Sequence, residues 1–409
     1  MILTICFLLL LAYIFDVTSA KTRIPSVILL IALGMGVHQL SIFLGFPIPD
    51  LEAILPQLGT IGLILIVLEG ALELELNESK LPLIGKSALL AIIPMLALSF
   101  LLGYAFHYFG DVSLKIGLAN AIPFAIISSA IAIPSAQNLG KFNKEFITYE
   151  SSLSDIFGVV FFNFITLNDN VGSKSFSDFF VELFFILIIT FIATLGLAFL
   201  LSKIKHHVKF LPIILIIISI YSLSKIYHLP ALIFIMLFGL FLGNLKLLKK
   251  NKYIHLLKPD ILDKEVHKFK ELTTEITFLV RALFFLLFGY LIQTSEIFNL
   301  DTIVWASGIT FGIFFLRLIS LKLFKLTIEP LYYIAPRGLI TILLFLTLPV
   351  TQQLDLSNKS LIVQVIIMTA LIMMVGLMVN SEEKSLEEIK EDSAEETTEE
   401  AAKDAPADH

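Results

Sequence analysis

The chain has 409 residues, of which 57% are hydrophobic and only 16% are charged, and its formal net charge is −6. Because an ordinary soluble domain is about 45–50% apolar and about 25% charged, this composition excludes a soluble globular protein and indicates an integral membrane protein. Residues 381–409 hold 12 Asp/Glu and 3 Lys, whereas the first 380 residues hold 26 basic and 23 acidic groups. An acidic tail on a mildly basic membrane protein gives no sign of nucleic-acid binding.

A single cysteine, Cys6, cannot form an intramolecular disulfide, and no Cys/His cluster has the spacing of a zinc or haem site. We therefore expect no cofactor, no metal beyond a transported ion, and no enzyme activity, since no nucleophile motif or soluble catalytic domain is visible. The first 20 residues resemble a signal peptide but lack a basic n-region, and Lys21 and Arg23 follow the apolar run instead. This arrangement favours an uncleaved first span.

The sequence predicts an all-α integral membrane protein with about 13 transmembrane helices, because a helix needs about 20 mostly apolar residues to cross the bilayer. The predicted spans are 2–19, 24–43, 54–75, 84–108, 112–138, 147–167, 178–202, 208–227, 229–247, 271–293, 299–323, 329–350 and 358–380. Connections after odd-numbered spans hold 19 Lys/Arg, and those after even-numbered spans hold 4. The positive-inside rule then places the N-terminus outside and the tail in the cytoplasm, in a plasma membrane.

Weak internal similarity predicts two inverted repeats. Spans 2 and 9 each carry a proline followed nine residues later by a glycine: Pro25/Gly34 and Pro230/Gly239. Spans 3 and 10 share the pattern Leu-x-Gly-x-Leu at 68–72 and 287–291. An offset of seven spans inverts one copy, so spans 1–6 and 8–13 form inverted repeats joined by span 7, as in secondary transporters. Chance recurrence of Pro and Gly in apolar helices is the alternative.

Span 6 carries two carboxylates at membrane depth, where an ionisable group is by default a functional hypothesis. At 1.5 Å per residue, Glu150 lies roughly 5 Å and Asp155 roughly 12 Å from the cytoplasmic end. Residues four apart share a helix face, so Ser151 and Asp155 form an oxygen-rich edge for a small cation, and Glu150 and Ser154 form an edge that faces an arginine. The alternatives are an Asp155 that serves only packing and a Glu150 that is solvated at the helix end.

Three arginines lie within the predicted spans, away from the span ends. Arg317 in span 11 and Arg337 in span 12 fall at the depth of the span 6 carboxylates. Arg281 in span 10 lies deeper, and we expect it to pair with Glu69 of span 3 as a structural link between the repeats.

Spans 5 and 12 are predicted to be discontinuous. Span 5 contains Pro123 and Pro134 with serines between them, and span 12 contains Pro336 and Gly338 beside Arg337. Such interruptions are tolerated in a membrane only where the freed backbone groups line a cavity or are buried in protein. Because the two spans are repeat mates, we expect them to cross and to form a binding site with their half-helix ends.

Three segments resemble a known family. Glu150-Ser151 followed by Ser154-Asp155 is similar to the Glu-Ser-x-x-Asn-Asp motif of that family. Residues 335–339 are similar to its Arg-Gly segment in the second broken helix. Arg317 occupies the position of an arginine that pairs, in that family, with the glutamate of the motif. These features resemble the monovalent cation–proton antiporter superfamily, with its NhaP and NHE sodium–proton exchangers. Ser128-Ser129-Ala130 departs from the exchangers' Thr-Asp-Pro and resembles the Kef-type potassium–proton antiporters.

The resemblance implies exchange of Na⁺, or of K⁺ or Li⁺, for H⁺ by alternating access, with Asp155 carrying either the proton or the cation. Ser128, Ser129 and Ser151 would add oxygen ligands. The neutral Ser154 before Asp155 predicts electroneutral exchange. A homodimer is expected, with scaffold segments 1–83 and 208–293, core segments 84–167 and 299–380, and linker 178–202.

Two rival functions remain open at this point. One is a sodium-coupled symporter of an organic anion, in which Arg337 would hold a carboxylate, and the other is a K⁺/H⁺ antiporter of the Kef type. The acidic tail 381–409 is predicted to be disordered. It would be either a solvated terminus or a regulatory segment that binds the lysine-rich connection 246–270.

Overall fold

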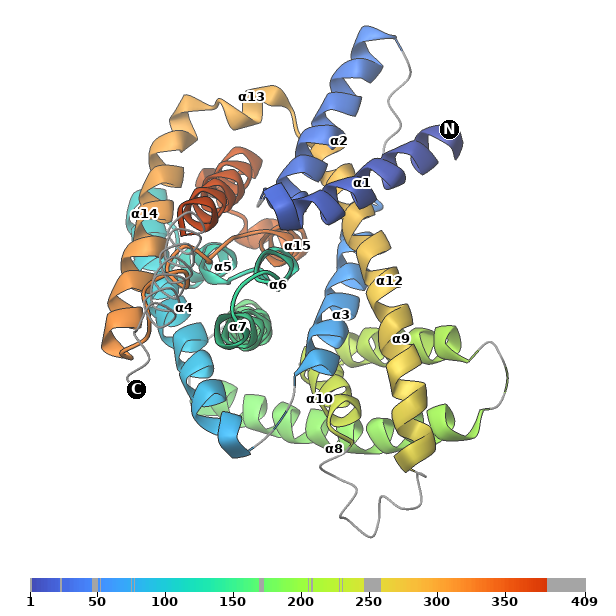
Figure 1. Cartoon of the computed structure of the whole chain (residues 1–409). Coiled ribbons are helices and arrows are strands. Elements are labelled where there is room, and N and C mark those ends of the chain that lie inside the picture. The colour runs from blue at the N-terminus through green and yellow to red at the C-terminus, as the bar shows by residue number, and fades with distance from the viewer. Residues whose placement is uncertain are drawn as a thin grey trace, which may run out of the picture.

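The computed structural model describes residues 2–22, 24–45, 51, 53–74, 76, 78–168, 173–204, 206, 209–227, 229, 231–245 and 259–380. These residues form an all-helical structure (Figure 1). The helices are α1 Ile2–Thr22, α2 Ser26–Phe43, α3 Leu55–Glu73, α4 Leu81–Gly110, α5 Leu114–Ala125, α6 Ser129–Ser135, α7 Lys141–Leu167, α8 Ser173–Lys203, α9 Phe210–Ile226, α10 Ala231–Gly243, α12 Pro259–Leu291, α13 Thr294–Ile297, α14 Leu300–Leu323, α15 Leu339–Thr347 and a C-terminal helix, Lys359–Asn380. The predicted tail 381–409 lies outside the described residues.

The all-α membrane fold is confirmed. Among the described residues, nine helices are long and apolar enough to cross a membrane, with α5 and α6 taken together as one, and three shorter apolar helices accompany them. The count of thirteen full spans is not confirmed, because predicted span 12 (329–350) contains only the nine-residue helix α15.

The break predicted in span 5 is present. Helix α5 ends at Ala125, residues 126–128 are not helical, and α6 begins at Ser129. In span 12, the predicted helical half before the break is absent, since residues 334–338 have no regular structure and turns precede them. Pro330 and Pro336 cannot donate helical backbone hydrogen bonds, and the carbonyl of Pro336 instead accepts a bond from outside the segment.

Helix α7 lies at the centre of the view in Figure 1, between two groups of helices. In one group, α4 packs against α5, α7 and α14, and α15 packs against α5. In the other, α12 packs against α2 and α3, and α10 packs against α3 and α8. Helix α3 also contacts α6, α7 and α15, so it forms the boundary between the two groups.

Three of the four glycines in the predicted repeats lie at helix crossings, whereas the fourth, Gly70, faces Ser152 of α7. Where α2 crosses α12, a Cβ on Gly34 would lie 2.2 Å from the carbonyl oxygen of Leu286, and one on Gly289 would lie 2.3 Å from that of Ile31. Where α10 crosses α3, a Cβ on Gly239 would lie 2.7 Å from the Cβ of Ala71. Small residues let membrane helices approach to backbone contact, and the glycines shared by spans 2 and 9, Gly34 and Gly239, each lie at such an approach.

The α2–α12 crossing gives a prediction with an internal control. Gly34→Ala should lower the melting temperature of the purified protein, because the added methyl group meets backbone that cannot move aside, and overpacking typically costs about 1–3 kcal/mol. Gly36→Ala on the same helix should leave the melting temperature unchanged, since nothing lies within 4 Å of its Cβ position. Equal effects of the two substitutions in a thermal unfolding assay would contradict the close crossing.

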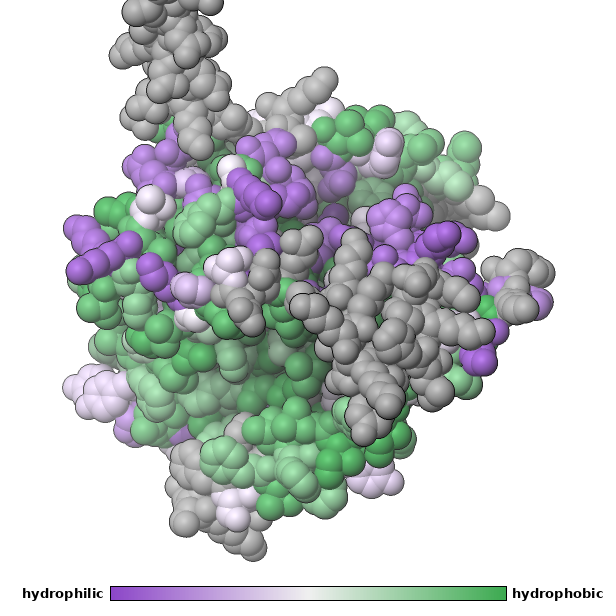
Figure 2. Space-filling model, turned by 60° about the horizontal axis from the view of Figure 1, so that its bottom comes forward, coloured by the Kyte–Doolittle hydropathy of each residue, from purple (hydrophilic) through white to green (hydrophobic). Residues whose placement is uncertain are grey.

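The outer surface is strongly apolar. Large hydrophobic side chains on α1, α4, α8 and α14 are exposed, among them Phe7, Phe100, Phe191 and Phe311. Figure 2 shows a broad hydrophobic area on one face, next to a band of hydrophilic residues. This separation fits a protein whose apolar belt contacts lipid and whose polar band lies at the membrane boundary.

Candidate functional site

Asp155 lies on α7 opposite the break between α5 and α6. Its side chain is 1% exposed. Its Oδ2 accepts a short hydrogen bond from the hydroxyl of Ser129, the first residue of α6, while its Oδ1 is buried without a hydrogen-bond partner. The helix face predicted from sequence therefore meets the break, although only one of the two carboxylate oxygens is satisfied there.

The two interrupted segments cross at this position. The backbone N–H of Ser128 donates to the carbonyl of Pro336 at 2.9 Å, which joins the break after α5 to the segment before α15. A Cβ on Gly338 would lie 2.9 Å from the Ser128 hydroxyl, so a larger residue would collide with the crossing. Ser154 lies on the adjacent face of α7, and its hydroxyl accepts a bond from the Ile127 N–H at 3.0 Å. Ser154 thus positions the break.

Arg337 is buried and binds the end of α5. Its Nε donates to the carbonyl of Phe124 at 2.5 Å, one terminal nitrogen donates to that of Ala125 at 3.3 Å, and the other donates to that of Ala335 at 2.8 Å. Its backbone N–H donates to the Thr369 hydroxyl at 3.1 Å. The last carbonyls of a helix lack helical partners and carry partial negative charge, so the guanidinium satisfies the half-helix end.

Glu150 and Arg317 form a buried bidentate ion pair. The two terminal nitrogens of Arg317 donate to the two carboxylate oxygens of Glu150 at 2.7 and 3.0 Å, and both side chains are almost fully buried. Arg317 Nε also donates to the Leu331 carbonyl at 2.6 Å. The pair therefore links α7, α14 and the turns that precede the second break.

Several buried oxygens near the crossing have no hydrogen-bond partner. Besides Asp155 Oδ1, they include the hydroxyl of Ser128, and the hydroxyl of Ser152, which faces Gly70 of α3, is also unpartnered. The hydroxyl of Ser151, predicted to share the Asp155 edge, donates to the carbonyl of Ile147 at 2.7 Å. Only the lone pairs of its oxygen therefore remain to bind a cation. Oxygen ligands suit hard cations. Within the described residues, no group of three His, Cys, Asp or Glu side chains could hold a resident metal.

A polar cavity of about 290 Å³ leads to Ser129 from the boundary between the two helix groups. Its lining comes from α1, α3, α6 and α12 and includes the carboxylates Asp16, Glu69 and Glu73 and the guanidinium of Arg281. Two of these carboxylates are paired, Asp16 with Arg281 at 3.6 Å and Glu73 with Lys270 at 3.5 Å. The cavity reaches Ser129, whose hydroxyl binds Asp155.

Glu69 and Arg281 line the same cavity, but among the described residues no ion pair joins them. Arg281 instead contacts Asp16 at 3.6 Å, and Asp16 also accepts a hydrogen bond from Ser26 at 3.1 Å. The reason is packing, because α1 lies against both α2 and α12. Glu69 faces the same cavity without a contact to Arg281 that would count as an ion pair.

Sequence reasoning missed Asp16, Ser152 and Thr369. Asp16 was detectable, since it is a charged residue inside a predicted span and such a residue calls for a partner. Ser152 and Thr369 carry no comparable signal, because serine and threonine are ordinary in membrane helices and bond to their own backbone.

Comparison with known proteins supports the same fold. The transmembrane region of the sodium/hydrogen exchanger family matches residues 6–381. The structure is similar to that of the sodium proton antiporter MjNhaP1 from Methanocaldococcus jannaschii at pH 8, with a TM-score of 0.68 and 19% identity over 93% of this chain and 98% of that one. An electron microscopy structure of the same antiporter gives a TM-score of 0.64 and 19% identity over 95% and 98%.

Among curated proteins none matches the sequence. The family match nevertheless covers nearly the whole chain. The chain therefore belongs to the sodium/hydrogen exchanger family, a family of transporters.

Proposed function

We propose that this protein exchanges Na⁺ for H⁺, one for one, and that the two ions compete for the carboxylate of Asp155. The observation that carries the proposal is the state of Asp155: it is buried beside the crossing, and its Oδ1 has no partner. Family membership supports cation/proton antiport in general.

Charge balance at Asp155 couples the movement of Na⁺ to the movement of H⁺. The guanidinium of Arg317 is bound to Glu150, and that of Arg337 is bound to backbone carbonyls. An isolated carboxylate is expensive to bury, so Asp155 is stable in the crossing only with a bound proton or a bound cation. Each ion neutralises the same charge, and a carrier that cannot hold both exchanges one for the other.

The crossing supplies ligands for a dehydrated cation. The hydroxyls of Ser128 and Ser152 are unpartnered, and those of Ser129 and Ser151 keep acceptor lone pairs. Together with Asp155 they form a set of hard oxygen donors, of the kind that replaces water around a small cation. We favour Na⁺ over K⁺ and Li⁺ on the family match, and parallel fluxes with the three cations test that choice.

The state of Arg337 argues against sodium-coupled symport of an organic anion. A carboxylate substrate would need an accessible guanidinium, whereas that of Arg337 is buried and donates to three carbonyls that would lose their partner. Releasing it would leave the end of α5 unsatisfied, which is costly in a membrane interior.

We further propose that core segments 84–167 and 299–380 move against scaffold segments 1–83 and 208–293, with 178–202 as linker, in a homodimer in the plasma membrane. The packing supports this division, since α3 and α12 pair mainly within one group and α4 and α7 within the other. The cavity lies between the groups, where relative movement would open and close it. We retain the predicted topology, with the N-terminus outside.

One-for-one exchange predicts transport that is insensitive to voltage. Glu150 is held by Arg317 and Ser154 is neutral, so Asp155 alone changes its charge state in each cycle. Sodium-driven proton flux in proteoliposomes, measured with the membrane potential clamped at several values by K⁺ and valinomycin, should keep the same rate. A rate that changes systematically with potential would refute this stoichiometry.

A further inference from the structure

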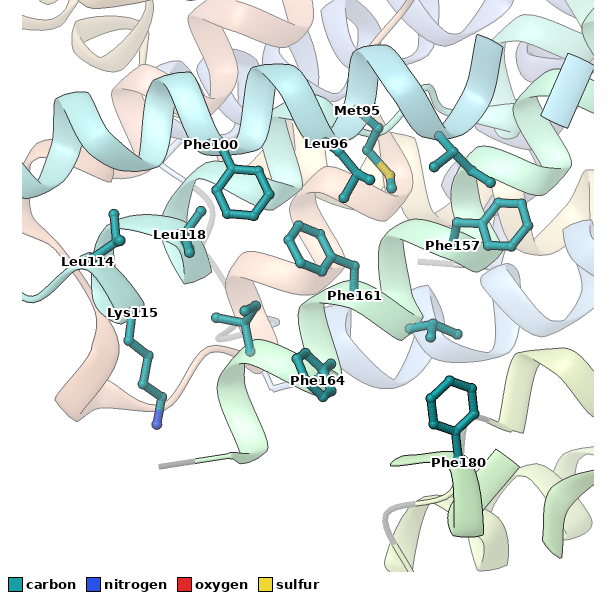
Figure 3. A pocket seen from close by; sticks show the side chains of 13 residues that line it. Met95, Leu96, Phe100, Leu114, Lys115, Leu118, Phe157, Phe161, Phe164 and Phe180 are labelled. Atoms are coloured by element: carbon teal, nitrogen blue, oxygen red, sulfur yellow. The ribbon is translucent and has the colours of Figure 1, made fainter. Parts of the chain in front are cut away.

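Helices α4 and α7 border two cavities of different character. One, of about 660 Å³, lies between α4, α5, α7 and the beginning of α8 (Figure 3). Its lining is apolar except for Lys115, which already has an interaction partner, so nothing in it distinguishes one hydrocarbon from another. The other, of about 550 Å³, lies where α4 and α7 begin, and its lining includes Lys80, Lys86 and Lys141.

We propose that this second cavity, the basic pocket, binds the phosphate headgroup of an anionic phospholipid. The one acidic residue of its lining, Glu145, pairs with Lys80 at 3.1 Å. Within the part of the chain that the structure describes, Lys86 and Lys141 are exposed and have no hydrogen-bond or ion-pair partner. The surrounding sequence, 78–86 and 141–145, holds four lysines and two glutamates. The pocket therefore carries a net positive charge.

Both helices that form the pocket begin at it. Helix α4 begins at Leu81 and α7 at Lys141, and the residues before them, Lys80 and Gly140, make no side-chain capping hydrogen bond. Neither helix has an acidic residue in its first turn. The first backbone N–H groups of a helix lack helical partners and carry partial positive charge. Two uncapped helix ends therefore add to the attraction of the lysines for a phosphate group.

The apolar part of the lining favours a lipid over a soluble phosphate compound. Beside the lysines, the pocket is lined by Pro82, Leu83, Phe142 and Phe146. Phe142 is 50% exposed, so this apolar surface is open to the surroundings. A cationic rim next to an apolar wall suits a molecule that has both a charged headgroup and hydrocarbon chains. Basic pockets at the cytoplasmic ends of membrane helices bind anionic headgroups in this way, and the proposed topology places both helix ends on that side.

The acidic tail of the chain itself fits the pocket less well. Residues 381–409 carry carboxylates, but their large apolar side chains are only Leu386 and Ile389. A tail segment at the lysines would leave most of the apolar lining in contact with water, whereas the acyl chains of a lipid cover it.

The fluorescence of a single tryptophan in the pocket tests the site. In a Trp305→Phe background, which removes the sequence's one tryptophan, Phe142→Trp places the reporter in the lining at a half-exposed position. The full-length protein in a nonionic detergent is titrated with dioctanoyl phosphatidylglycerol, with dioctanoyl phosphatidylcholine and with glycerol phosphate. The two lipids share their chains and differ in net charge, and glycerol phosphate carries the charge without the chains.

Phosphatidylglycerol should change the emission saturably, at a lower concentration than either comparison compound. It should also raise the melting temperature of the unsubstituted protein, because its headgroup joins the ends of α4 and α7. One lysine near an anionic headgroup corresponds to about a fivefold difference in affinity, so Lys86→Gln and Lys141→Gln should each raise the half-saturating concentration about fivefold. Lys322→Gln, at an exposed lysine of α14 outside the pocket, should leave it unchanged.

Equal half-saturation for the two lipids, or no change in Lys86→Gln and Lys141→Gln, would overturn the selection of an anionic headgroup. Glycerol phosphate that binds as tightly as phosphatidylglycerol would assign the pocket to a soluble phosphate compound and overturn the lipid. A reporter insensitive to all three compounds, with an unchanged melting temperature, would overturn the site, as expected if the acidic tail fills it. These readouts do not involve transport, so they are independent of the proposed ion exchange.

Discussion

Replacing Asp155 by asparagine should abolish sodium-driven proton flux, leaving no more than protein-free liposomes show. The amide keeps an acceptor for the Ser129 hydroxyl, so the crossing is preserved, but it can neither ionise nor balance the charge of a bound cation. The melting temperature should therefore stay at or above that of the unsubstituted protein, because the change removes a buried ionisable group.

Asp301→Asn is the matched control, since Asp301 is exposed at the beginning of α14 and lies outside the cavity. It should retain full exchange. An Asp155→Asn protein that is folded and still exchanges at a substantial fraction of the normal rate would remove Asp155 from the mechanism.

Breaking the ion pair between Glu150 and Arg317 should lower the stability of the protein more than breaking an exposed ion pair does. Removing one partner of a buried pair leaves an uncompensated charge and costs about 3–5 kcal/mol. Arg317→Met should destabilise more than Glu150→Gln, because Arg317 also holds the carbonyl of Leu331 before the second break. The double variant should recover part of the loss, since no unpaired charge remains.

Thermal unfolding of the two single variants and the double variant completes a double-mutant cycle. Glu145→Gln provides the comparison, because Glu145 pairs with Lys80 at 3.1 Å in a partly exposed position, where a salt bridge contributes about 0–1 kcal/mol. Strictly additive losses for Glu150→Gln and Arg317→Met, or a loss for Glu145→Gln as large as theirs, would contradict a dominant buried pair.

The helical periodicity of the sequence predicted part of the candidate site. The spacing of four residues predicted different partners for the two carboxylates, and Asp155 contacts Ser129 at the break while Glu150 binds Arg317. Ser154, predicted to share the arginine-facing edge with Glu150, instead accepts a hydrogen bond from Ile127 in the break. Gly34, Gly239 and Gly289 lie at helix crossings, where a close backbone approach requires the absence of a side chain and is therefore visible in the sequence. Depth and helix face follow from the local sequence, whereas the partner of each side chain depends on how the helices pack.

Contacts between distant helices were harder to predict. Hydropathy measures how apolar residues 329–338 are but not whether they are helical, and their backbone is held by Ser128, Arg317 and Thr369 instead. The partner of Arg281 depended on how α1 lies across α12, and no periodicity encodes that placement. Ser151 faces the predicted edge but donates to its own helix, a choice that a short hydroxyl side chain always has.

Proton release on sodium binding tests the central claim most directly. Sodium is titrated into the detergent-solubilised protein by calorimetry, in buffers of equal pH but different ionisation enthalpy, at a pH where the free site is protonated. Competition at Asp155 predicts one proton released for each Na⁺ bound, apparent sodium affinity that falls as the pH is lowered, and no binding heat in Asp155→Asn. Sodium that binds without releasing a proton, or that binds equally well to Asp155→Asn, would contradict exchange through a shared carboxylate.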